Sequence, residues 1–153
     1  MWFGEREEHY GAECSESDVA ALLARALPRL RALRLMNADF TDEVVPLVIA
    51  SPIAGQLEVL DFSLGTLSDT GAGALAAART AFPRLTGLRV YDCALTSRGL
   101  ARLHDAGFPV DETPGTPAEA QCLAWRHESP ASYQRWQPGT RSQKTHRFVS
   151  VSE

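Results

Sequence analysis

Hydrophobic residues recur along this chain in three similar stretches. Each stretch opens on a leucine, has an aliphatic or aromatic residue at its fourth and sixth positions, and continues with small or apolar residues at its ninth and eleventh. The opening leucines are Leu30, Leu57 and Leu85, which lie 27 and 28 residues apart. A nearly constant period of this length predicts a repeat array, in which no single unit encloses its own apolar face.

The first half of each unit predicts a strand and the second half a helix. Alternation such as Leu33-Arg34-Leu35 is typical of a short strand with one buried face. Polar residues that favour helix starts then precede apolar runs of helical spacing. We expect helices to open at Thr41, at Ser68-Asp69 and at Ser97, the last closed by Gly107.

Incomplete units flank the three full ones. Ser15 and Asp18 resemble a helix-capping pair, and an apolar stripe follows until Pro28: Val19, Leu22, Leu23 and Leu27. Met1-Trp2-Phe3 stands where the preceding strand is expected, and Phe108 to Asp111 predicts a last, shortened strand. Residues 1–112 are therefore expected to form about three full repeats with a partial one at each end.

The pattern breaks at the C-terminal end. Residues 113–145 have few aliphatics among their Ser, Gln, Arg and Pro residues, so little apolar surface is available for burial. We expect residues 113–153 to form an irregular tail. Alternation returns at residues 147–152, and this part is expected to dock as an extended segment.

The predicted fold is α/β, a right-handed solenoid shaped as a short horseshoe. Stacked units close a common core, with parallel strands on the concave face and the bulkier helices on the convex face. Nine residues are expected to fill this core: Leu30, Leu33, Leu35, Leu57, Leu60, Phe62, Leu85, Leu88 and Val90. Phe40, Leu67 and Leu95 are expected to turn inward after the strands.

The residues between these core positions are the candidate binding surface. The concave face is expected to show two rows, Arg34/Asp61/Arg89 and Met36/Ser63/Tyr91, with outer rows Arg31/Glu58/Thr86 and Asn37/Leu64/Asp92. Alternating charges at one strand spacing predict a ladder of ion pairs. Two interpretations stay open: the ladder is solvated and satisfies itself, or the rows bind a protein partner through Tyr91 and an arginine, residue types that dominate hot spots.

The three repeated stretches, spaced 27 and 28 residues apart, resemble known leucine-rich repeats of the ribonuclease-inhibitor-like class. More narrowly, Trp2-Phe3-Gly4 with His9-Tyr10-Gly11, the segment Leu60 to Ala72 and the terminal Phe148 to Glu153 resemble an STM-type family of bacterial cytoplasmic leucine-rich-repeat proteins. The resemblance implies a leucine-rich-repeat solenoid that corresponds to the C-terminal portion of such proteins. It implies no activity and no catalytic residue, because none is assigned to the family.

Sequence signals for catalysis, cofactors and metals are missing. The four histidines are far apart, and the three cysteines form no clip of ligand spacing. Gly65, Gly71 and Gly73 lack the lysine and spacing of a phosphate loop. Cys93 is expected to fill the turn beneath its strand and not to act as a nucleophile. We therefore predict that the protein is not an enzyme and has no cofactor or metal.

Charge and hydropathy exclude two further partner classes. The net charge is −4, with ten basic and sixteen acidic residues in residues 1–112, which argues against nucleic-acid binding. Apolar runs such as Val44 to Ala50 are far shorter than the roughly 20 residues of a spanning helix. The N-terminus has no basic region followed by an apolar one, so we expect a cytoplasmic protein and no membrane partner.

The leading hypothesis is a non-catalytic protein-protein interaction module that uses the concave face. A second hypothesis is a truncated or terminal piece of a larger repeat protein, which self-associates through its uncapped N-terminal repeat face. A third is an accessory subunit of a bacterial modifying enzyme, contacted through the C-terminal tail.

Overall fold

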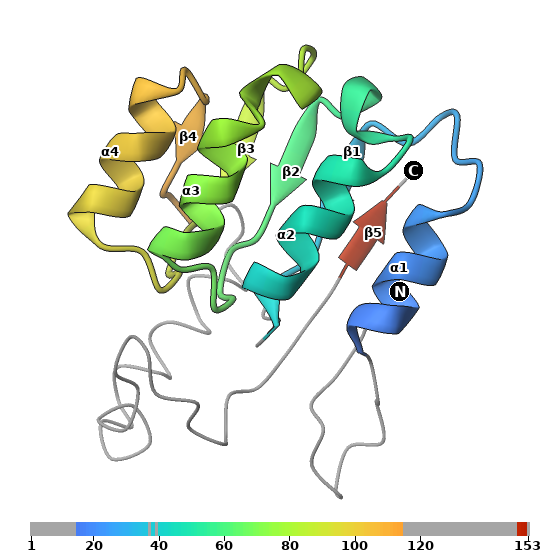
Figure 1. Ribbon diagram of the computed structural model, residues 1–153, viewed down its shortest axis with the longest axis horizontal. Helices are drawn as coiled ribbons and strands as arrows, with labels where there is room; N and C mark the ends of the chain where they lie inside the picture. Colours follow the sequence, from blue (N-terminus) through green and yellow to red (C-terminus); the bar gives the residue numbers. More distant parts are fainter. Residues whose placement is uncertain (1–14, 37, 39, 115–149, 153) are drawn as a thin grey trace, which may run out of the picture.

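The computed structural model describes residues 15–36, 38, 40–114 and 150–152, and shows an α/β fold (Figure 1). Four parallel strands lie in one sheet: β1 (Ala32–Arg34), β2 (Val59–Asp61), β3 (Gly87–Arg89) and β4 (Val110–Asp111). A fifth strand, β5 (Ser150–Ser152), pairs antiparallel with β1, so the order across the sheet is β4-β3-β2-β1-β5. Sequence neighbours among the parallel strands are therefore also neighbours in space.

The register of the parallel strands repeats the sequence period. Leu33 lies opposite Leu60, and Leu60 lies opposite Leu88. Successive side chains of a strand point to opposite faces, so this register puts one leucine of each strand on the same buried face. The predicted strand phase is confirmed.

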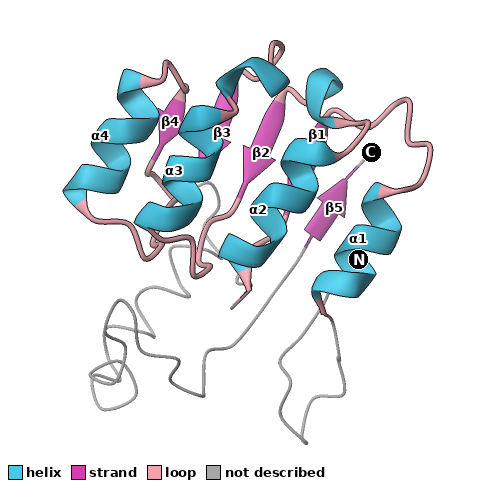
Figure 2. Ribbon diagram, in the orientation of Figure 1, coloured by secondary structure: helices cyan, strands magenta, loops and turns pink. Residues whose placement is uncertain are grey.

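Four helices lie on one side of the sheet, as Figure 2 shows. They are α1 (Glu16–Leu23), α2 (Thr41–Ala50), α3 (Asp69–Ala77) and α4 (Ser97–Asp105), and each packs against the next. Two short 3-10 helices, η1 (Ala54–Gln56) and η2 (Arg79–Ala81), lead back toward the strands. The opposite face of the sheet has no described helix over it.

The helix starts agree with the sequence signals. Ser68 and Thr96 are the N-cap residues of α3 and α4, and each side-chain oxygen accepts a hydrogen bond from a first-turn N–H group. Gly107 follows α4 with a φ of 77°, the left-handed conformation that glycine adopts without steric cost. One boundary differs. The predicted stripe places Leu27 in the first helix, whereas α1 ends at Leu23 and Leu27 packs against the core from the following loop.

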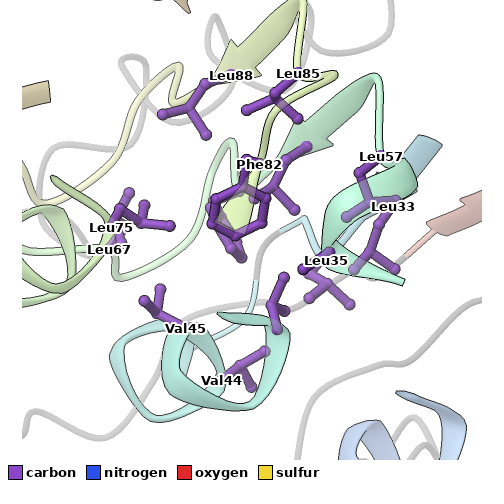
Figure 3. Close-up of a cluster of buried hydrophobic side chains, with 14 of the residues drawn as sticks. Leu33, Leu35, Val44, Val45, Leu57, Leu67, Leu75, Phe82, Leu85 and Leu88 are labelled. Carbon is purple, nitrogen blue, oxygen red and sulfur yellow. The ribbon is translucent and has the colours of Figure 1, made fainter. Parts of the chain in front are cut away.

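The core lies between the sheet and the helices (Figure 3). All nine predicted core residues are buried, as are Phe40 and Leu67, whereas Leu95 is partly buried. Phe82, which the repeat pattern does not single out, is fully buried and lies among the leucines in Figure 3. Its ring centroid lies 6.2 Å from that of Phe108, over which the Arg79 guanidinium packs at 4.9 Å. Phe82 therefore joins the repeating core to its last unit.

Two sequence expectations lie outside the described residues, namely the Met1-Trp2-Phe3 strand and nearly all of the irregular tail. Of the segment 147–152, residues 150–152 form β5, and they pair with β1. The outer edge of β1, which the sequence predicts to be uncapped, is thus occupied by a later part of the same chain. Across the part of the chain that the structure describes, no helix has the length and apolar character needed to cross a bilayer.

Candidate functional site

A row of charged residues crosses the sheet on the face away from the helices. The register places Arg34 opposite Asp61, Asp61 opposite Arg89, and Arg89 opposite Asp111. Neighbouring strands lie about 4.8 Å apart, so each charge has opposite charges on the adjacent strands. The predicted alternation thus extends to a fourth strand. The sequence did not predict Asp111 as a member of this row, because β4 follows β3 by fewer residues than the repeat period.

The centre of the row is a buried ion pair. Arg89 Nη1 donates to Asp61 Oδ2 at 2.9 Å, and the Asp61 side chain is fully buried while that of Arg89 is 12% exposed. The other carboxylate oxygen, Oδ1, accepts from the Ser63 backbone N–H at 3.0 Å. Removing one partner from such a pair leaves an uncompensated buried charge. Asp61 is therefore a structural anchor of the row.

The β4 end of the row is held by a second carboxylate. Arg89 Nε lies 3.7 Å from Asp111 Oδ2. The Thr113 hydroxyl and backbone N–H both donate to Asp111 Oδ1, at 2.6 and 2.9 Å. The hydroxyl bond first, and then the backbone bond, lower the pKa of Asp111 below its ordinary value of 3.8, with a smaller contribution from the Arg89 charge. This end of the row is thus ionised and internally satisfied at neutral pH.

The β1 end of the row differs from the rest. Arg34 is half-buried, and its Nε atom is buried without a hydrogen-bond partner. Within the described residues, Arg34 makes no ion pair, although Asp61 lies opposite it in the register. Each oxygen of Asp61 accepts one bond, from Arg89 Nη1 and from the Ser63 N–H, and no described bond of Asp61 comes from Arg34. Arg34 is therefore a cation at the edge of the row that has no ion-pair partner among the described residues.

The second predicted row, Met36/Ser63/Tyr91, is mostly buried. Ser63 is fully buried, and its hydroxyl accepts a hydrogen bond from the Tyr91 N–H at 3.3 Å. Tyr91 is only 8% exposed, whereas Met36 is half-buried. The expectation that Asp61, Ser63 and Tyr91 project into an open hollow is therefore wrong. Strand parity gives the face on which a side chain lies, but Asp61 and Ser63 are short and hydrogen-bond within the structure.

The outer rows behave differently from each other. Arg31 and Glu58 approach to 3.7 Å with about half of each side chain exposed, an arrangement that contributes about 0–1 kcal/mol. In the other outer row, Leu64 and Asp92 have φ angles of 64° and 50°, the left-handed conformation, while Asn37 lies outside the described residues. The strand ends therefore turn at equivalent positions in consecutive units.

One row on this face was missed by sequence reasoning. Ala32, Val59 and Gly87 lie opposite one another in the register and are half-buried. They form a shallow apolar strip beside the charged row, two residues earlier in each strand. The alternation of each strand places these residues on this face, but their types did not indicate a binding surface.

A repeated carboxylate contact joins the helical sides of neighbouring units. Asp42 accepts from the Ser68 N–H at 2.9 Å and its hydroxyl at 2.5 Å. One unit later, Asp69 accepts from the Thr96 N–H at 2.9 Å and its hydroxyl at 2.6 Å. Each carboxylate thus receives two donors from the N-cap residue of the following helix, which fixes the spacing of the units.

Cys93, the residue considered as a nucleophile, has a structural role. The Cys93 thiol lies 3.2 Å from the Phe62 carbonyl oxygen and donates to it, as expected of a residue that closes the turn below its strand. In the part of the chain that the structure describes, no three His, Cys, Asp or Glu side chains gather where a metal ion could bind. The charged row is therefore the candidate site.

Comparison with known proteins gives a similar fold but no family. No protein-family model matches the chain, and no curated protein matches it. The crystal structure of a protein from Bacteroides fragilis is similar, with a TM-score of 0.63 and 24% sequence identity. The match covers 72% of this chain and 33% of that protein, so this chain spans about a third of its length. At this identity, the likeness concerns the fold alone.

Proposed function

We propose that this chain is a leucine-rich-repeat solenoid of the ribonuclease-inhibitor-like class, and that it binds a protein partner without catalysis. The repeat period of 27 and 28 residues, the in-register parallel strands and the layer of helices on one side support the solenoid. The carboxylate contacts at Asp42 and Asp69 support it as well, because they join consecutive units in the same way.

The observation that supports binding most directly is the state of the sheet face that has no described helix over it. Its charged row is internally paired at Asp61, Arg89 and Asp111, whereas Arg34 has no ion-pair partner among the described residues. Beside Arg34, Met36 and Ala32 are half-buried and apolar. Arginine next to apolar surface is the composition that dominates protein interfaces. We therefore assign the binding surface to the β1 side of this face.

Affinity capture with the full chain as bait tests this proposal. The variant Arg34→Glu with Met36→Asp reverses the charge and polarity of the assigned surface. Arg98→Glu is the matched control, because Arg98 is exposed on α4, within the helix layer. We expect the wild type and the control to retain the same partner, identified by mass spectrometry, and the double variant to lose it while its thermal unfolding stays cooperative. Retention of every partner by the folded double variant contradicts the proposal.

A further inference from the structure

The outer edge of β1 has the backbone geometry of a strand-binding site. The Arg31 C=O and the Leu35 N–H bond toward β2, to the N–H groups of residues 58 and 59 and to the Asp61 carbonyl. The backbone groups of a strand alternate in direction, so those of Ala32 and Arg34 point the other way, toward β5. Two residues of β1 thus offer a donor and an acceptor each to whatever strand lies at this edge.

The strand that occupies this edge is short. β5 has three residues, paired Ala32 with Ser152, Leu33 with Val151 and Arg34 with Ser150. β5 follows β4 in the sequence, and β4 lies at the opposite edge of the sheet. No tight turn therefore joins β5 to β1 and fixes it in place. A three-residue ladder without a hairpin turn is marginal by itself. A longer extended segment would therefore compete with it for this edge.

The charge pattern identifies which segment fits best. Across the sheet the row reads Arg34, Asp61, Arg89 and Asp111, alternating in sign at every strand. The next position in the same row is the one opposite Arg34 on the strand at the edge, where β5 has a neutral serine. Alternation would put a carboxylate there. Such a carboxylate would meet the one guanidinium in the row that lacks an ion-pair partner among the described residues.

The surroundings of β1 favour the same charge. Residues 29–36 include Arg29, Arg31 and Arg34 and no acidic residue. Among the described residues, Arg31 alone of these three arginines is in an ion pair, at 3.7 Å from Glu58 and half-exposed. The excess of arginine in this segment would repel an incoming basic segment and attract an acidic one.

We propose that the outer edge of β1 binds an extended acidic segment of a protein partner, which pairs antiparallel with β1, puts a carboxylate opposite Arg34 and displaces β5. This mode of recognition adds a strand to a sheet edge, so main-chain bonds provide affinity and the alternate side chains provide selectivity. The inference rests on the proposed function, because it names the chemistry of the partner at the same end of the charged row.

Two short peptides test the charge preference. The first has the sequence of residues 148–152 with Asp in place of Ser150, and the second has Asn at that position; both have blocked ends and a fluorescent label. The protein is the full chain with Ser152→Pro, because the Ser152 N–H faces Ala32 and its loss weakens the competing strand. Binding is measured by fluorescence anisotropy, and circular dichroism verifies the fold of each variant.

We expect the acidic peptide to bind about tenfold more tightly than the Asn peptide, as for one charge-assisted bond. Arg34→Gln should abolish this difference, and added salt should reduce it. Equal affinities, no binding of either peptide, or a preference that survives Arg34→Gln would overturn the proposal. Equal affinities together with a dimer in sedimentation would instead assign the edge to β5 of a second copy.

A measurement within the chain itself does not depend on the peptides. Ser150→Asp should raise the urea midpoint of unfolding relative to Ser150→Asn, and the gain should vanish with Arg34→Gln. No gain would overturn the charge assignment. If both tests fail while the Arg34→Glu and Met36→Asp variant still loses its captured partner, the proposed function stands and the partner contacts the sheet face and not its edge.

Discussion

At the level of single residues, Gly71 and Gly99 are what allow neighbouring units to bond through Asp42 and Asp69. A Cβ atom at Gly71 would overlap the Asp42 carboxylate and lie 2.6 Å from a Leu67 methyl carbon. At Gly99 it would overlap the Asp69 carboxylate in the same way. The missing side chain leaves the space that the carboxylate of the preceding unit fills. These glycines are therefore needed for close approach, and not for backbone flexibility.

Gly71→Ala and Gly73→Ala should change stability in opposite directions. Gly71→Ala displaces the Asp42 carboxylate, and we expect a loss of about 1–3 kcal/mol, the usual cost of overpacking. Gly73 lies in the same helix, but its nearest neighbour would be Arg102 Nη1 at 3.5 Å, an ordinary contact. Gly73→Ala should gain up to about 1 kcal/mol from helix propensity. Urea unfolding of both variants measures the difference, and equal losses would contradict this explanation.

The site could be predicted from sequence only as far as strand parity reaches. Parity placed Arg34, Asp61 and Arg89 on one face, and the register confirms this alignment. It could not show that Asp61 is fully buried, because burial depends on the neighbouring Arg89 and on the Ser63 N–H. Nor could it show that Arg34 is the member left without an ion pair in the described structure, since strand parity does not decide which of the two neighbouring arginines pairs with Asp61.

At the level of elements, polar start signals defined the helices better than their apolar stripes did. Ser68 and Ser97 mark the starts of α3 and α4 to within one residue. The apolar stripe of the first helix predicted an end that is too late, because Leu27 is partly buried without being helical. An apolar residue in a loop can fill the core as well as one in a helix. Caps are local interactions, and for this reason they can be recognised in a sequence.

Helix α2 contains an internal proline that should lower its stability. Pro46 is the sixth residue of the helix and is exposed, so its ring makes no core contact that would compensate. It lacks the N–H that would bond to the Asp42 carbonyl. We expect Pro46→Ala to raise the free energy of unfolding by up to about 3 kcal/mol. Pro52→Ala, in the turn after the helix, is the control in differential scanning calorimetry and should give no gain.

At the level of the whole molecule, three carboxylates make stability depend on acid pH. Asp18, Asp69 and Asp111 have pKa values below the ordinary 3.8, each chiefly because a Ser or Thr hydroxyl donates to it, from Ser15, Thr96 and Thr113 respectively. A carboxyl whose pKa is lower in the folded state stabilises the fold above its unfolded pKa. That contribution is lost as the pH falls through the folded value.

We therefore expect the urea midpoint to be constant near neutrality and to fall below about pH 4, where these groups begin to bind protons in the unfolded state. Asp69→Asn should make the acid decline shallower, because one of the three carboxyls is gone. Asp105→Asn is the control, since the exposed Asp105 carboxylate makes no hydrogen bond with the described residues. If Asp69→Asn leaves the pH profile as steep as the control does, the attribution to Asp69 is incorrect.

The repeating part of the fold was more predictable than the contacts between distant parts of the chain. A period of 27 and 28 residues implies stacked strand-helix units, and the nine leucine, valine and phenylalanine positions of that period are all buried. The burial of Phe82 and the place of β5 were not predicted, since the other units have Leu27 and Ala54 at the position of Phe82, and β5 has no equivalent in them. Repetition reveals what recurs along a chain, whereas contacts between its distant parts occur once and leave no period.

The pairing of β5 with β1 also affects how the chain folds during its synthesis. Residues 35–149 must be translated after β1 before β5 exists, which takes several seconds at about 5–20 residues per second. During that time the parallel units can form one after another on the ribosome, while the edge of β1 lacks the strand that covers it in the finished protein. A chaperone that binds extended segments would meet this edge in the nascent chain.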